Sequence, residues 1–159
     1  MNRTGARRIA KELQLIRSRA MQSVRFHGLS MYPFLQEGDL VVVEPVDWGE
    51  IRRGDVVTYR LVDKYPTRRV VRKGAEHLEL WCENWPANHF HALRDDVLGR
   101  AAARERSGRW LHRQDEEWQR AAREALRRYR RVWVRKLAGR VKHLPVLRWA
   151  RRLKPPVPG

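Results

Sequence analysis

Residues 26–43, FHGLSMYPFLQEGDLVVV, form the stretch that decides the fold of this chain. Gly28 permits backbone dihedrals that other residues avoid, and Pro33 fixes its own φ while pushing Tyr32 toward an extended conformation. The apolar run at 40–43 then predicts a strand. Ser30 is therefore expected on a stiff turn that leads into a sheet. Such a turn can present a nucleophile, but it also suits an ordinary connection to a strand, and the local pattern leaves both interpretations open.

Four further short motifs come after the box at 28–33. They are Gly38-Asp39, Arg53-Gly54-Asp55-Val56-Val57, Arg69-Val70-Val71 and Leu98-Gly99-Arg100. Together with the box at 28–33, their order resembles that of the LexA/signal-peptidase superfamily. The resemblance is closest to signal peptidase I-like serine peptidases, in a short form that lacks the transmembrane span. It covers about Val24 to Arg106 and implies the β-fold of that superfamily.

Alternating or apolar runs predict the strands of this β core. The predicted strands lie at 24–26, 40–43, 56–62, 69–72, 77–81 and 96–101. Turn residues at 63–66 make 56–72 a predicted hairpin. The continuous apolar run at 40–43 predicts a strand that is buried on both faces.

Both ends of the chain carry helical periodicity. Apolar residues recur at three or four in 7–22, and again from about Asp115, where the second stripe comprises Leu126, Tyr129, Trp133, Leu137, Val141 and Leu144. Pro145 ends or kinks the second helix, and three prolines within 155–158 predict a disordered or extended tail. We therefore expect an α+β chain with a mainly β core. Its parts are a basic amphipathic N-terminal helix at 1–23, a signal-peptidase-like β domain at 24–113, and a basic amphipathic C-terminal helix with a Pro-rich tail at 114–159.

The net charge of +17 is concentrated in the two ends of the chain. Residues 1–25 hold seven Lys/Arg and one acid, and residues 115–159 hold fourteen Lys/Arg and four acids. Residues 26–114 are nearly neutral, with fourteen Lys/Arg and thirteen acids. Basic arms of this kind favour anionic partners. The helix at 7–22 is expected either to lie on a membrane surface or to cover the sheet.

The sequence lacks the motifs of metal sites, membrane spans and secretory signals, and this lack predicts the cofactor content and the cellular location. The single cysteine, Cys82, and six histidines without paired ligand spacing predict no metal site and no cofactor. No apolar run approaches the roughly 20 residues of a membrane span. The first residues are too charged for a secretory signal. We therefore expect a cytoplasmic protein, with peripheral attachment at the inner membrane face through 1–23 and 115–153 as an additional expectation.

The resemblance assigns the nucleophile to Ser30 and the general base to the residue directly before the Arg-Val pair. In the resembled family that base is a Lys, or a His in some branches. Here the position is occupied by Arg68, which precedes Arg69-Val70. Arginine side chains carry donors only and are not deprotonated in proteins, so Arg68 is not a competent base. It could still bind a carboxylate or shape the electrostatics around the serine.

Two residues remain as alternative bases. Lys64 shares strand parity with Arg68 but lies near the predicted turn. His27 is close to Ser30 in sequence, yet on an extended strand it points away from it. A base from elsewhere in the fold, an engineered Arg68 or a natural pseudoenzyme would also account for the arginine, and the sequence does not separate them.

The resemblance also implies roles for the residues around these positions. Those expected at the substrate groove are Gly28, Met31, Tyr32 and Pro33, and the N–H of Ser30 is expected to be an oxyanion donor. Those expected to be structural are Asp39, Asp55, Arg69 and Asn84. Cys82-Glu83 stands where the family carries Gly-Asp before this Asn.

These residues support two main functions. The first is a serine endopeptidase of the signal-peptidase I/LexA type that cleaves a leader or precursor peptide after a small residue. The alternative is a catalytically impaired or inactive homologue that binds a peptide or partner protein on the same fold. Nucleic-acid binding through the arms ranks third, because no groove-reading motif accompanies the charge.

Overall fold

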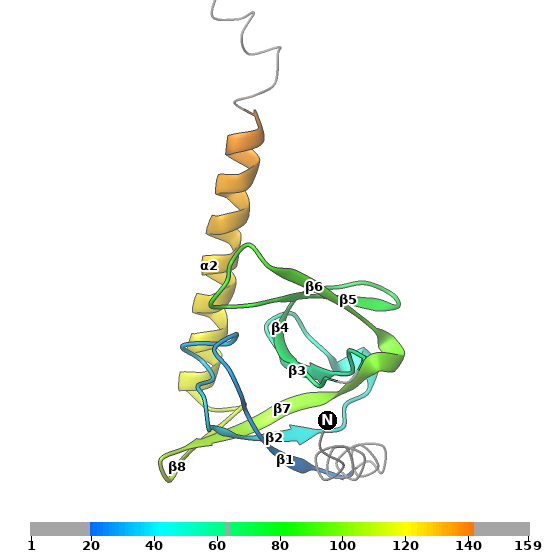
Figure 1. Cartoon of the computed structure of the whole chain (residues 1–159), viewed down its shortest axis with the longest axis vertical. Helices are drawn as coiled ribbons and strands as arrows, with labels where there is room; N and C mark the ends of the chain where they lie inside the picture. Colours follow the sequence, from blue (N-terminus) through cyan, green and yellow to red (C-terminus); the bar gives the residue numbers. More distant parts are fainter. Residues whose placement is uncertain (1–19, 63, 142–159) are drawn as a thin grey trace, which may run out of the picture.

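The structure is a computed structural model that describes residues 20–62 and 64–141. Eight antiparallel strands form one coiled sheet, in the order β1-β2-β7-β3-β4-β5-β6 with β8 paired to β7 (Figure 1). Their bounds are β1 Gln22–Arg25, β2 Leu40–Glu44, β3 Val56–Tyr59, β4 Thr67–Lys73, β5 His77–Trp81, β6 His89–Leu93, β7 Val97–Arg106 and β8 Arg109–His112. Two short 3-10 turns, η1 Trp48–Glu50 and η2 Arg94–Asp96, precede a long helix, α2 Glu116–Val141. A mainly β core with a C-terminal helical extension is confirmed.

Strand β7 connects the two halves of the sheet. Along one edge it pairs with β2, and along the other edge it pairs first with β3 and then with β8. Its register with β2 slips between Val42 and Val43. A Cβ atom at Gly99 would lie 2.5 Å from the carbonyl oxygen of Glu44. Glycine is therefore required at this position for the two strands to meet.

The predicted strands are mostly confirmed, with corrections at their ends. The hairpin at 56–72 is present as β3 and β4, although β3 ends at Tyr59. The prediction that 40–43 is buried on both faces is wrong, because burial alternates along β2, with Val41 and Val43 in the core and Val42 half-exposed. The helix predicted at 7–22 lies almost wholly outside the described residues, and its last residue, Gln22, begins β1. The Pro-rich tail also lies outside them.

Helix α2 lies along the side of the sheet and extends past β5 and β6 (Figure 1). Trp118, 2% exposed, packs edge-on against Phe34 with ring centroids 4.8 Å apart. Two turns on, Leu126 and Tyr129 pack against a cluster that contains Trp81. The predicted apolar stripe is thus divided, because its first half belongs to the core of the domain. Trp133, Val134 and Leu137, in the next turns, are exposed.

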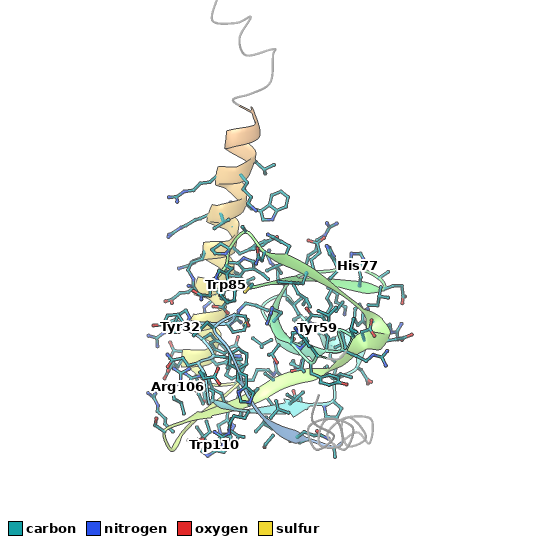
Figure 2. The ribbon with its side chains drawn as sticks, viewed as in Figure 1. Tyr32, Tyr59, His77, Trp85, Arg106 and Trp110 are labelled. Atoms are coloured by element: carbon teal, nitrogen blue, oxygen red, sulfur yellow. The ribbon has the colours of Figure 1, made fainter. Side chains whose placement is uncertain are left out.

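No helix within 20–62 and 64–141 combines the length and the apolar character that crossing a bilayer requires. The hydrophobic cores lie instead inside the coiled sheet and under α2. Tyr59, 1% exposed, is among the core residues that Figure 2 shows within the sheet.

Candidate functional site

Ser30 lies on a tight turn between β1 and β2 that is held in place by Glu37. Gly28 adopts φ +92°, and its N–H donates to a carboxylate oxygen of Glu37. The other oxygen of Glu37 lies 2.9 Å from Nδ1 of His27. The hydrogen bond from the Gly28 N–H, followed by the contact with His27, lowers the pKa of the Glu37 carboxyl. The turn that the glycine and proline predicted is therefore held by an acid from the later part of the same connection between β1 and β2.

The carbonyl of Ser30 is fastened to the loop that follows β5. The backbone N–H of Asn84 donates to it at 3.2 Å, and the buried thiol of Cys82 lies 3.0 Å from it. Ser30 itself is only 8% exposed. Asn84 thus acts through its main chain, so the contact does not depend on the asparagine side chain.

Arg68, on β4, is the side chain that hydrogen-bonds to the serine hydroxyl. Its Nη1 donates to Ser30 Oγ at 2.6 Å and to the carbonyl of Thr67 at 2.8 Å. The guanidinium lies 5.1 Å from the centroid of the Phe90 ring, and its Nε is buried without a hydrogen-bond partner among the described residues. The structure therefore brings together Ser30 and the residue at the base position, and that residue can only donate.

A groove of about 490 Å³ opens beside this pair. It is bounded by residues from 24–30 and 64–68, together with Val41, Thr58 and Trp85. Both alternative bases, His27 and Lys64, line the groove, but neither forms a hydrogen bond to Ser30. Lys64 lies in the tight turn after β3, where it pairs with Leu61.

Only part of the expected groove set lies at the groove. Gly28 lines it, but Met31 is completely buried in the core beside Phe34 and Leu35. Tyr32 and Pro33 are exposed without lining the groove. The turn after Ser30 rotates successive side chains to different sides, so that Met31 points inward although Tyr32 and Pro33 do not. Of the expected set, Gly28 alone lines this groove, and a role of Met31, Tyr32 and Pro33 in substrate binding stays a prediction.

A buried ion-pair network connects the backbone around Ser30 to β4 and α2. Arg69, with no exposed surface, donates to Glu83 at 2.7 Å and to the carbonyl of Gly54 at 2.6 Å. Arg128 of α2 donates to the second carboxylate oxygen of Glu83 at 2.8 Å. Since Glu83 lies between Cys82 and Asn84, α2 is connected through it to the backbone that holds Ser30. Sequence reasoning missed Glu83 and Arg128, although a glutamate at the family's aspartate position preserves the carboxylate.

The aspartates of the two Gly-Asp boxes each close a turn. Asp39 accepts from Arg106 at 2.7 and 2.6 Å and from the N–H of Gln36. Burial acts to raise the pKa of Asp39, but these hydrogen bonds and the neighbouring guanidinium charges outweigh it and hold the pKa below its ordinary value. Asp55 accepts from the N–H of Arg52 at 2.8 Å and lies 3.5 Å from Arg100.

A serine on a glycine-proline turn, an antiparallel sheet after it and a strand that brings the base position to the serine define the serine-peptidase fold of the LexA/signal-peptidase superfamily. The family model described as Peptidase S24-like matches residues 3–101, and the chain belongs to that family. The closer resemblance to signal peptidase I stays a prediction. The comparison with curated proteins found no match.

Proposed function

We propose that this protein binds an extended peptide segment in the groove beside Ser30 and that Arg68 prevents the serine from cleaving the bound peptide. The observation that carries the proposal is the 2.6 Å hydrogen bond from Arg68 to Ser30 Oγ. Peptide recognition is the ligand class that the peptidase family supports.

The chemistry of the pair disfavours efficient hydrolysis. A serine attacks a peptide carbonyl when a neighbouring base accepts its proton. The guanidinium has no lone pair for that proton, and its N–H occupies a lone pair on the attacking oxygen. Because Arg68 is also fixed by the Thr67 carbonyl, this arrangement does not depend on a freely rotating side chain.

An edge strand supports the mode of binding. Within the described residues, β1 pairs with β2 alone, and it stands at one end of the sheet order. Val24, Arg25 and Phe26 of this segment line the groove that contains Ser30. A peptide that adds to such an edge gains main-chain hydrogen bonds, while side-chain pockets supply specificity.

The test uses pooled, N-acetylated decapeptides, half with a free carboxylate and half with a C-terminal amide, incubated with the full-length protein. Mass spectrometry then measures which peptides are retained and whether new termini arise. We expect retention without cleavage, lowered by Leu29→Asp at the groove and unchanged by Leu93→Asp, a matched exposed leucine on β6. New termini that disappear in Ser30→Ala, or retention equal in both leucine variants, would refute the proposal.

The second candidate is a working serine endopeptidase for a leader or precursor peptide, and one observation favours it. His27 lines the same groove as Ser30, and its Nδ1 contacts Glu37. A carboxylate on one ring nitrogen orients the other to act as a base. In that case Ser30-dependent cleavage of the decapeptides should be lost in His27→Gln. If Lys64 supplies the base instead, Lys64→Met should abolish it.

We also propose that the distal part of α2 attaches the domain peripherally to an anionic membrane. Trp133, Val134 and Leu137 are exposed there. The basic residues around them are Arg127, Arg130, Arg131, Arg135 and Lys136. Aromatic and aliphatic side chains flanked by cations suit the head-group region of anionic lipids. In this proposal the peptide groove works close to membrane-borne precursors.

A further inference from the structure

We infer that the Ser30–Arg68 pair is a receptor for the C-terminal carboxylate of a peptide. This inference rests on the peptide-binding function proposed above and specifies the end of the ligand that the groove selects.

Among the residues that the structure describes, none neutralises the charge of Arg68. Three other arginines of the sheet that are mostly buried face carboxylates, in the pairs of Arg69 with Glu83, Arg100 with Glu44 and Arg106 with Asp39. Arg104, half-buried on β7, forms no such pair among the described residues and lies over the Phe34 ring, outside the groove. Among the described residues, no carboxylate lies within salt-bridge distance of Arg68, whose partners are a hydroxyl and a carbonyl. A half-buried cation whose partners are neutral favours the binding of an anionic group from a ligand.

The described residues that line the groove carry a positive charge. Arg25 and Lys64 line it together with Arg68, and His27 is a fourth nitrogen side chain on its wall. No aspartate or glutamate is among the described residues that line it. Arg25 is held by the carbonyl of Gly38 at 2.8 Å, which leaves its charge without a carboxylate partner there. The potential in the groove is therefore positive, and an anionic ligand is attracted to it.

The hydrogen-bond roles within the pair also suit a carboxylate. Arg68 donates to Ser30 Oγ, so the serine is the acceptor in that contact and its own O–H remains a donor. The pair thus offers a guanidinium and a hydroxyl proton side by side, which matches the two oxygens of a carboxylate. A neutral amide would not use this combination equally well, since it lacks charge.

The position of the pair favours a chain terminus over an acidic side chain. A peptide that runs along β1 brings its main chain, rather than its side chains, to the serine. In a peptidase fold the carbonyl to be cleaved lies at the serine. A peptide that ends there places its terminal carboxylate on the same atoms.

The experiment uses two sets of N-acetylated hexapeptides with identical randomised sequences, one with free carboxylates and one amidated, and the full-length protein. We expect the wild type to retain the free acids about tenfold more strongly than the amides, because one charge-assisted hydrogen bond contributes an affinity difference of about that size. Arg68→Gln should remove this preference, and Ser30→Ala should reduce it. Thermal unfolding of each variant checks that the fold is intact, and Arg72→Gln, an exposed arginine on the same strand, is the matched control.

The outcomes separate this inference from the proposed function. Equal retention of acids and amides that still depends on Leu29 would overturn the carboxylate receptor while peptide binding stands. Retention of neither set would overturn the peptide-binding function. Selection of amidated peptides that carry internal Asp or Glu would assign the site to a side-chain carboxylate and contradict the inference. A preference that survives Arg68→Gln would contradict it as well.

Discussion

The Nη1 atom of Arg68 donates a 2.6 Å hydrogen bond to Oγ of Ser30, so that a permanent cation occupies the place of a general base. The two residues are 38 positions apart and meet because β4 lies beside the turn that follows β1. In this contact the proton points from Arg68 to the serine, which is opposite to the transfer that a general base would carry out.

Glu83→Gln should destabilise the domain by about 3 kcal/mol, because it leaves the fully buried Arg69 without its carboxylate. Arg128→Gln should cost about 1 kcal/mol or less, since the Arg128 side chain is 44% exposed. Urea unfolding of both variants measures the difference. Equal losses in the two variants would mean that the buried pair does not dominate the network.

Acid should destabilise the domain through Asp39. Its pKa is lowered in the folded protein, so its stabilising contribution is present above the ordinary value of 3.8 and is lost as the pH falls through the lower folded value. Asp39→Asn should cost about 2 kcal/mol at pH 7, the size of its bonds to Arg106, and should flatten this part of the stability profile. Urea unfolding between pH 2 and pH 7 is the measurement. An unchanged slope in the variant would assign the acid sensitivity to other groups.

Flotation with vesicles tests the membrane proposal. Wild type should float with anionic vesicles and much less with neutral ones or at high salt, because each basic residue near the surface contributes about 1 kcal/mol. Trp133→Ser with Leu137→Ser should abolish flotation without unfolding, since both side chains are exposed.

The matched control for flotation is Trp110→Ser, an exposed tryptophan on β8, remote from the distal helix (Figure 2). Removal of 115–159 is unsuitable, because Trp118 and Ala125 belong to the core. Flotation unaffected by the double substitution would refute attachment through α2. Binding of RNA at comparable salt, without flotation, would instead favour a nucleic-acid partner.

The sequence patterns predicted the positions of the strands and the helix more accurately than they predicted which faces of these elements are buried. The turn residues at 63–66 and the acids at 115–117 act locally, so the hairpin at 56–72 and the start of α2 were predictable. The apolar run at 40–43 looked doubly buried, yet one face of β2 is only partly covered, and a single strand does not reveal what packs on it.

The site was predictable where it depends on sequence order. The resemblance carried by the order of the motifs implied both Ser30 and Arg68, and the structure brings the two residues into contact. The inward position of Met31 depends on the turn geometry, which residue types alone do not specify. The role of Glu83 required the position of Arg128, 45 residues away on a helix whose docking no local pattern encodes.

Labelling with a fluorophosphonate probe tests most directly whether Arg68 prevents Ser30 from acting as a nucleophile. Arg68→Lys restores a side chain that can lose a proton, and a general base contributes roughly 10²–10⁴-fold. We expect little labelling of the wild type, labelling of Arg68→Lys about 100-fold faster or more with the adduct on Ser30, and none in the double variant that adds Ser30→Ala. Equal labelling of the wild type and Arg68→Lys, or faster labelling of the wild type, would contradict this role of Arg68.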